Sequence, residues 1–144
     1  MSLNPEESMM VAASTGHIEA LKEMVADHHP LTSRVAACAA RGGQVVVLKW
    51  LKGQSCPVDE GAITQAATAG HLHAIKWMRS QCPPHPWNAH AVTEASRYGH
   101  LETVRWLHEN GCPWNADATA VAGQRGHLDV MSYLHFNDCP WPDK

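Results

Sequence analysis

Eleven histidines and five cysteines are the residues of this 144-residue chain best suited to chemistry, because both types bind transition metals. Four of the histidines, His17, His71, His100 and His127, each follow a glycine directly and recur at regular distances. Ligands of one metal ion lie ~2.0–2.1 Å from it, whereas helices stacked side by side lie ~8–10 Å apart. The sequence contains no His-Glu-x-x-His motif and no Cys-x-x-Cys pair. We therefore expect a structural role for these histidines, with no metal site and no cofactor.

The positions of the cysteines predict free thiols rather than disulfides or a catalytic centre. Cys56, Cys112 and Cys139 occupy one place in a recurring pattern, and Cys82 stands one place earlier. Residues one unit apart in a stack exceed the ~7 Å Cα separation that a disulfide allows. Free thiols are usual in a reducing compartment, so we expect the cytoplasm, with the nucleus as the alternative. A nucleophilic cysteine needs an oriented base beside it, and the sequence suggests no such base. It also contains no phosphate-binding loop and no carboxylate pair. We therefore expect no enzymatic activity.

These residues belong to a pattern of about 27 residues that occurs five times. Its glycines are 27, 27, 29 and 27 residues apart, and positions below are counted from each of them. Alanine stands at −4, apolar residues stand at +2, +5 and +8, and proline stands at +14 in every unit. The five glycines are Gly16, Gly43, Gly70, Gly99 and Gly126. Agreement at so many positions over five copies indicates an internal repeat.

Each unit is expected to form two short helices with the glycine as the turn between them. The apolar residues at +2, +5 and +8 share one face of the second helix. Residues that make good N-caps precede each first helix, namely Asn4, Thr32, Asp59, Asn88 and Asn115. No unit can bury its apolar face alone, so we expect an all-α solenoid of stacked helix-turn-helix units. The five units are residues 4–30, 31–57, 58–86, 87–113 and 114–141, in one domain over residues 1–144.

The units resemble a known family through the strings AASTGHIEALKEMV, AATAGHLHAIKWM and ASRYGHLETVRWLHENG. These strings are similar to the central part of ankyrin repeats, and the resemblance covers about residues 4–141. The units are shorter than the usual repeat of about 33 residues, and they lack the Thr-Pro-Leu-His opening of its first helix. The missing residues are expected to shorten the loops between repeats. The Cys-Pro-Trp variant looks like the short ankyrin arrays of giant viruses and microbial eukaryotes.

The overall composition argues against two classes of surface. Apolar residues make up 44% of the chain, and 11 Lys+Arg against 14 Asp+Glu leave a formal net charge of −3. A nucleic-acid-binding surface over the whole chain would require a basic excess. No apolar run approaches the ~18 residues of a membrane span, and residues 1–7 lack the layout of a signal peptide. We therefore expect no membrane association.

Without a catalytic set of residues, function is expected to be surface recognition. In the ankyrin family, which these units resemble, first helices line the concave binding face, and positions −5, −2 and −1 commonly face it. These positions differ from unit to unit here. They assign partner contacts to Arg41, Gln65, Thr68, Glu94, Arg97, Tyr98, Gln124 and Arg125. The sequence thus predicts a non-catalytic module that binds an acidic or mixed-polarity protein segment, with Tyr98 and its neighbour Arg97 most like a hot spot.

Two alternatives stay open. In the first, the chain is a nucleic-acid-associated protein that uses the basic residues of its second helices. These residues are Lys22, Lys49, Lys76 and Arg105 at +6, with Lys52 and Arg79 at +9. We prefer to interpret them as a solvated face in which i, i+3 ion pairs join Glu19 to Lys22 and Glu102 to Arg105, so nucleic acid is not the expected partner. In the second, the chain is a fragment of a longer repeat protein or associates weakly with itself, rather than being a monomer. The reason is that the last unit keeps apolar residues, Tyr133, Leu134 and Phe136, where a polar cap would be expected.

The tryptophans occupy two recurring places. Trp50, Trp77 and Trp106 stand at +7, next to the apolar position +8, whereas Trp87, Trp114 and Trp141 lie in the segments between units. We expect those at +7 to cover the boundaries between units rather than to stack on bases. The two extra residues of the 29-residue spacing are expected near Pro84 and His85.

Overall fold

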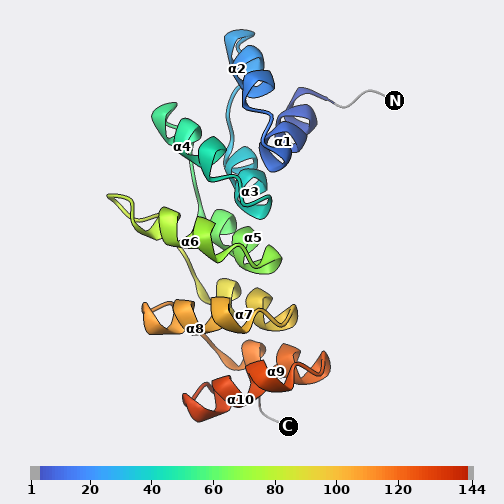
Figure 1. Ribbon diagram of the computed structural model, residues 1–144, viewed down its shortest axis with the longest axis vertical. Helices are drawn as coiled ribbons and strands as arrows, with labels where there is room; N and C mark the ends of the chain where they lie inside the picture. The colour runs from blue at the N-terminus through green and yellow to red at the C-terminus, as the bar shows by residue number, and fades with distance from the viewer. Residues whose placement is uncertain (1–3, 143–144) are drawn as a thin grey trace.

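The computed structural model describes residues 4–142, and this part of the chain forms ten helices and no strand (Figure 1). The all-helical class predicted from the sequence is confirmed. In chain order the helices are α1 (Pro5–Thr15), α2 (Ile18–Ala26), α3 (Ser33–Arg41), α4 (Val45–Gly53), α5 (Glu60–Ala69), α6 (Leu72–Arg79), α7 (Ala89–Arg97), α8 (Leu101–Glu109), α9 (Ala116–Gln124) and α10 (Leu128–Phe136). Each sequence unit supplies one pair of helices. None of the described helices is long and apolar enough to cross a membrane.

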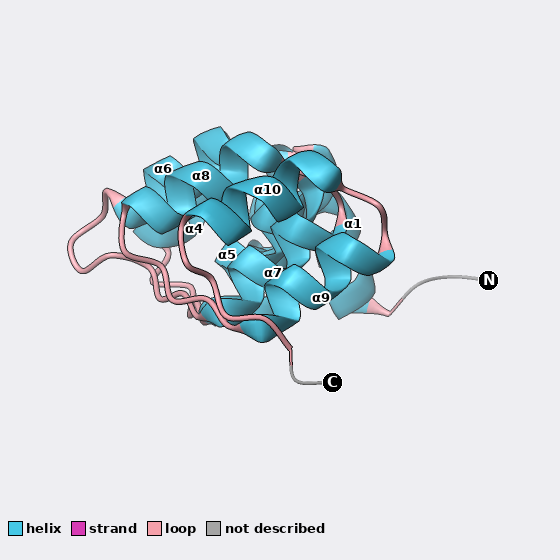
Figure 2. Ribbon diagram, turned by 90° about the horizontal axis from the view of Figure 1, so that it is seen from below, coloured by secondary structure: helices cyan, strands magenta, loops and turns pink. Residues whose placement is uncertain are grey.

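The helices lie in two layers (Figure 2). The first helix of each pair (α1, α3, α5, α7, α9) contacts the first helix of the next pair, whereas neighbouring second helices lie further apart. The helix pairs follow one another in a row, and they are more closely packed on the side of the first helices. The two ends of the row bend towards that side (Figure 1). Consequently, the first helices form the inner side of the curve.

The two ends of each first helix follow from the local sequence. The side chains of Asn4, Asp59, Asn88 and Asn115 accept hydrogen bonds from backbone N–H groups in the first turn. Such a bond satisfies one of the free N–H groups of a helix start. Thr32 differs, because it caps α3 without such a bond and its hydroxyl donates instead to Glu6, 3.1 Å away. The five shared glycines have φ between 67° and 80°, the left-handed region that glycine adopts at low cost.

Alanines at −4 let the first helices pack closely. Ala39, Ala66, Ala95 and Ala122 are completely buried, and Ala12 nearly so. On the second helices the apolar residues at +5 and +8 are buried in the three inner units, as the sequence pattern predicts. Small side chains on one layer and larger ones on the other therefore account for the tighter inner side of the curve.

The connections between pairs contain a second left-handed residue that the sequence did not reveal. Position +12 has positive φ at His28, Ser55, Gly111 and Asp138, although only one of these is a glycine. In each case the following N–H bonds to the carbonyl at +8, a pattern that closes a helix end. The connection after α6 is longer, residues 80–88, and contains the two extra residues as predicted.

Candidate functional site

The histidines at +1 connect neighbouring helix pairs. His127 Nε2 donates to the Arg97 carbonyl oxygen at 2.9 Å, and its ring lies directly over Gly99. A Cβ atom added to Gly99 would lie only 2.7 Å from His127 Nδ1. Equivalent contacts join Gln44 to Ser14, His71 to Arg41 and His100 to Thr68. This contact explains why glycine and histidine recur together, and it gives His71, His100 and His127 the structural role expected of them. His17 differs, because its Nδ1 lies 2.6 Å from the Thr15 hydroxyl of its own unit.

The cysteines at +13 link the end of a unit to the start of its first helix in three of the five units. Cys112 Sγ lies 3.5 Å from the carbonyl oxygen of Asn88, the residue that caps the first helix of the same unit. Cys56 makes the same contact with Thr32 at 3.4 Å, and Cys139 makes it with Asn115 at 3.5 Å. Burial raises the pKa of Cys112 to about 12 and the pKa values of Cys56 and Cys139 to about 11. These thiols are therefore protonated at neutral pH and are poor nucleophiles.

The tryptophans at +7, namely Trp50, Trp77 and Trp106, are partly buried and pack against the hydrophobic core. Aromatic partners extend the packing, since Trp106 meets Trp87 edge-on with ring centroids 6.2 Å apart. Most of the apolar surface of these rings is thus used by the fold itself.

Five of the eight residues assigned to partner contacts line two hollows along the first helices. The hollow nearer the N-terminus has a volume of about 270 Å³ and lies among α1, α3 and α5. It is lined by Met10, Arg34, Ala37, Cys38, Arg41 and Gln65. Arg41 Nη1 donates to Gln65 Oε1 at 3.0 Å, so two of the assigned residues meet across neighbouring units. Arg34 is held by Glu6 in an exposed ion pair of 3.3 Å.

The second hollow lies between α5, α7 and α9 and is larger, about 480 Å³. It is lined by Thr64, His90, Thr93, Glu94, Arg97, Asp117, Ala120, Val121 and Gln124. Glu94 and Arg97 form an ion pair of 2.8 Å in which each side chain is about one third exposed (30% and 31%). Both charges stay accessible in a hollow that also offers a carboxylate, an imidazole and an amide. Its chemistry is that of polar recognition.

Three assigned residues lie outside both hollows. The Thr68 hydroxyl donates to the Thr64 carbonyl of its own helix, at 2.9 Å. Tyr98 and Arg125 are exposed at the C-terminal ends of their helices, where position −1 follows the last full turn. The sequence reasoning missed positions −6 and −9, which provide Ala37 and Arg34 in the first hollow and their counterparts in the second. Helical periodicity was the available signal, because −9, −6, −5 and −2 lie on one face.

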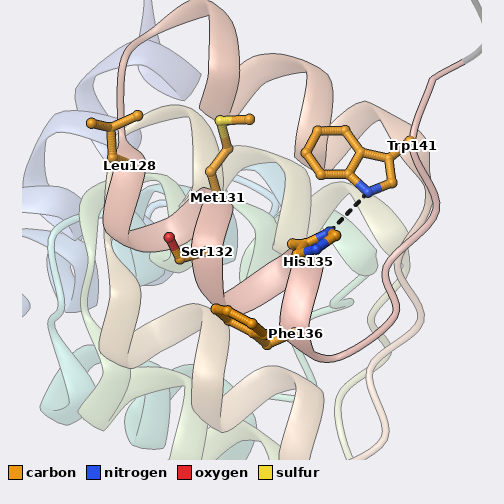
Figure 3. A pocket seen from close by; sticks show the side chains of 6 residues that line it. All are labelled: Leu128, Met131, Ser132, His135, Phe136 and Trp141. Carbon is orange, nitrogen blue, oxygen red and sulfur yellow. Dashed lines mark hydrogen bonds between the residues drawn. The ribbon is translucent and has the colours of Figure 1, made fainter.

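A mostly apolar hollow lies on the outer face of α10 and has a volume of about 410 Å³ (Figure 3). Leu128, Met131, Ser132, His135, Phe136 and Trp141 line it. The residues equivalent to Met131 in the inner units, Leu48, Ile75 and Val104, are buried. Tyr133 and Leu134 do not contribute to this face, contrary to the expectation from the sequence, because Leu134 is buried and Tyr133 packs edge-on against His108. Phe136 is 81% exposed and is the main apolar residue of this face.

The basic residues of the second helices fall into two groups. Lys22 pairs with Glu19 at 3.5 Å, and Arg105 pairs with Glu102 at 3.0 Å, as the i, i+3 spacing predicts. The remaining four, Lys49, Lys52, Lys76 and Arg79, make no ion pair within residues 4–142. Only α2 and α8, in the first and fourth units, therefore have the neutralised face that was expected.

No three His, Cys, Asp or Glu side chains of the described part gather in a way that could hold a metal ion. All five cysteines, which lie within that part, are free thiols. Burial lowers the pKa of His71 below its usual value, with a further contribution from neighbouring His73, so His71 is neutral at physiological pH. No family model matches the chain, and no curated protein matches it either.

Proposed function

We propose that the chain is an array of five ankyrin-like repeats and that it serves as a non-catalytic module for binding a protein segment on its first-helix face. The recurring Gly-His contact between units and the shared sequence pattern support a solenoid of repeats. The shortened loops fit connections of six residues without strands, such as 54–59 and 110–115. A reducing intracellular compartment fits the free, buried thiols.

The observation that carries the binding proposal is the polar hollow between α5, α7 and α9. Position −4 of these helices is a buried alanine in each case, whereas the residues that line the hollow differ from unit to unit. Variation confined to one accessible face is typical of a surface that recognises a specific partner. The accessible Glu94–Arg97 pair and Gln124 suit a segment that carries both a carboxylate and a hydrogen-bond donor.

The proposal is tested by selecting binders from a displayed library of twelve-residue peptides against the full chain. The Arg97→Ala/Gln124→Ala variant removes two side chains of the hollow, and Glu19→Ala/Lys49→Ala is a matched control on the second helices. We expect the selected peptides to bind the first variant at least tenfold more weakly and the control like the parent chain. Urea unfolding must give similar midpoints for all three proteins, because the one-third-exposed ion pair contributes at most about 1 kcal/mol to stability.

Equal binding of every selected peptide to the parent and to the hollow variant would refute the site. The variant Tyr98→Ala separates the hot spot suggested by the sequence from the hollow described by the structure. If Tyr98→Ala alone weakens binding, the partner extends beyond the hollow to the ends of the first helices. If it has no effect, the contacts are confined to the hollow.

A further inference from the structure

The outer layer of the molecule carries a group of four positive charges without a negative one among them. Helices α4 and α6 contain Lys49, Lys52, Lys76 and Arg79, and neither helix contains an aspartate or a glutamate. The three lysines are exposed, and Lys52 Nζ donates to the neutral side chain of Gln81. In the neighbouring α2 and α8, by contrast, the cation at +6 is neutralised by a glutamate one turn earlier.

This group is exceptional for an acidic chain. The formal net charge is −3, so the rest of the protein carries −7 once these four cations are set aside. Concentrating four of the 11 basic residues on two adjacent short helices creates a local positive potential that the composition conceals. The surface therefore favours an extended anion over a small neutral ligand.

A hollow with aromatic walls adjoins these charges. It has a volume of about 250 Å³ and is lined by Lys76, Arg79, Ser80, Trp87, Trp106 and Asn110. The Arg79 guanidinium lies 3.8 Å from the centroid of Trp87 and also donates to the His85 carbonyl at 2.9 Å, so its position is fixed before any ligand arrives. The lining thus combines two cations with two indole rings and contains no carboxylate.

We propose that the face formed by α4, α6 and the Trp87–Trp106 hollow binds single-stranded nucleic acid. Lysine and arginine contact successive phosphates, and the hollow receives an unstacked base against an indole ring, a combination typical of single-strand binding surfaces. A folded anionic protein or an anionic membrane would contact the same charges, but neither presents an unstacked base to the aromatic hollow. This face lies on the opposite layer from the proposed protein-binding hollow, so the two functions are independent (Figure 2).

The test uses the full chain and a fluorescein-labelled oligothymidylate of 20 nucleotides, with fluorescence anisotropy at several salt concentrations. Four neutralised phosphates give a slope of about −3 for log affinity against log salt, since each contributes about −0.7 on a single strand. Affinity should then fall about fifty-fold between 50 and 200 mM salt. Tryptophan quenching by an unlabelled oligothymidylate should saturate at the same concentrations, because a base occupies the hollow.

Two double variants with the same change in net charge locate the site. Lys49→Glu/Lys76→Glu reverses both unpaired cations at +6, and Lys22→Glu/Arg105→Glu reverses both paired ones. We expect the first to lose at least tenfold in affinity and the second to bind within threefold of the parent chain. Lys49→Gln/Lys76→Gln should show an intermediate loss, and circular dichroism checks the folding of each variant.

Three results would overturn the proposal. The first is no binding of the oligonucleotide at 20 mM salt, and the second is an equal loss of affinity in the two charge-reversal variants. The third is binding to vesicles containing phosphatidylserine together with no binding to the oligonucleotide, which would assign the charges to a membrane surface. Peptide binding at the first-helix hollow is measured separately, so each proposal can fail without the other.

Discussion

Replacement of Gly99 by alanine tests whether the packing of a histidine ring against the glycine of the preceding unit determines how the units stack. Gly99 and Gly126 have the same φ of 73°, so alanine meets the same backbone strain at both positions. They differ in their surroundings. A Cβ at Gly99 would lie 2.7 Å from His127 Nδ1, whereas a Cβ at Gly126 would have nothing within 4 Å.

The expected losses follow from these two environments. The left-handed conformation costs alanine about 1–2 kcal/mol, which applies equally to both variants. At Gly99 the new methyl group also crowds a fixed ring, and overpacking costs about 1–3 kcal/mol. If the ring moves away, the 2.9 Å hydrogen bond of His127 to Arg97 is weakened, which costs about 1 kcal/mol. We therefore expect Gly99→Ala to destabilise the protein by about 2 kcal/mol more than Gly126→Ala.

Urea unfolding followed by tryptophan fluorescence measures this difference. With a slope of about 2 kcal/mol per molar urea, the two midpoints should differ by about 1 M. Gly111→Ala is a second control, because Gly111 also has positive φ and open space around it but lies in an inner unit. In the double variant Gly99→Ala/His127→Ala the crowding disappears, so the combined loss should be smaller than the sum of the single losses.

Equal destabilisation by Gly99→Ala and Gly126→Ala would contradict this reasoning, because only backbone strain would then matter. Additive losses in the double variant would lead to the same conclusion. Either result would mean that the histidines are incidental to the stacking, and that buried alanines alone set the spacing of the units.

Three further predictions follow from buried or shifted groups. Ser96 replaces the alanine found at −3 in the first three units, and its buried hydroxyl has no hydrogen-bond partner among residues 4–142. Ser96→Ala should therefore stabilise the protein by about 1 kcal/mol in urea unfolding, and a loss of stability would indicate a hydrogen bond to a bound water. Exposed Cys82 should react with iodoacetamide at pH 8 in the native protein, whereas Cys112, whose pKa burial raises to about 12, should react only after unfolding, as peptide mass spectrometry would show. Because burial lowers the pKa of His71 in the folded state, the unfolded chain takes up a proton more readily, so stability should fall as the pH drops below about 6.5. His71→Gln, which copies Gln44 at the same position, should reduce this loss between pH 7 and pH 5, and an unchanged pH profile would exclude His71 as its source.

Much of the fold could be predicted from the residues because the helix signals are local. Side-chain caps such as Asn88 and turns such as Gly99 act within a few residues, so their spacing alone locates the helices. The left-handed residues His28, Ser55 and Asp138 escaped prediction because side chains of these types rarely adopt positive φ. Only the closure of the helix by a bond to position +8 places them there.

The candidate sites were less predictable, because they depend on which side chains meet across units. Positions −5 and −2 could be assigned from a family resemblance, but the Arg41–Gln65 contact joins residues 24 positions apart. Likewise, the residues at +6 form one regular series in the sequence. Only the packed structure shows that the first and last members of this series form ion pairs with glutamates, whereas the two middle members form none within residues 4–142. One of the middle members, Lys76, also lines the Trp87–Trp106 hollow.

The residues alone determine the ten helices, their pairing and the packing positions, since periodicity and turn chemistry act over short distances. They also show that four of the eleven histidines and three of the five cysteines stand at recurring positions of one repeated pattern. Tertiary packing settles which surface is hollowed and which charges stay unpaired. Both properties depend on distances between units, and a regular sequence pattern leaves those distances open until the helices are stacked.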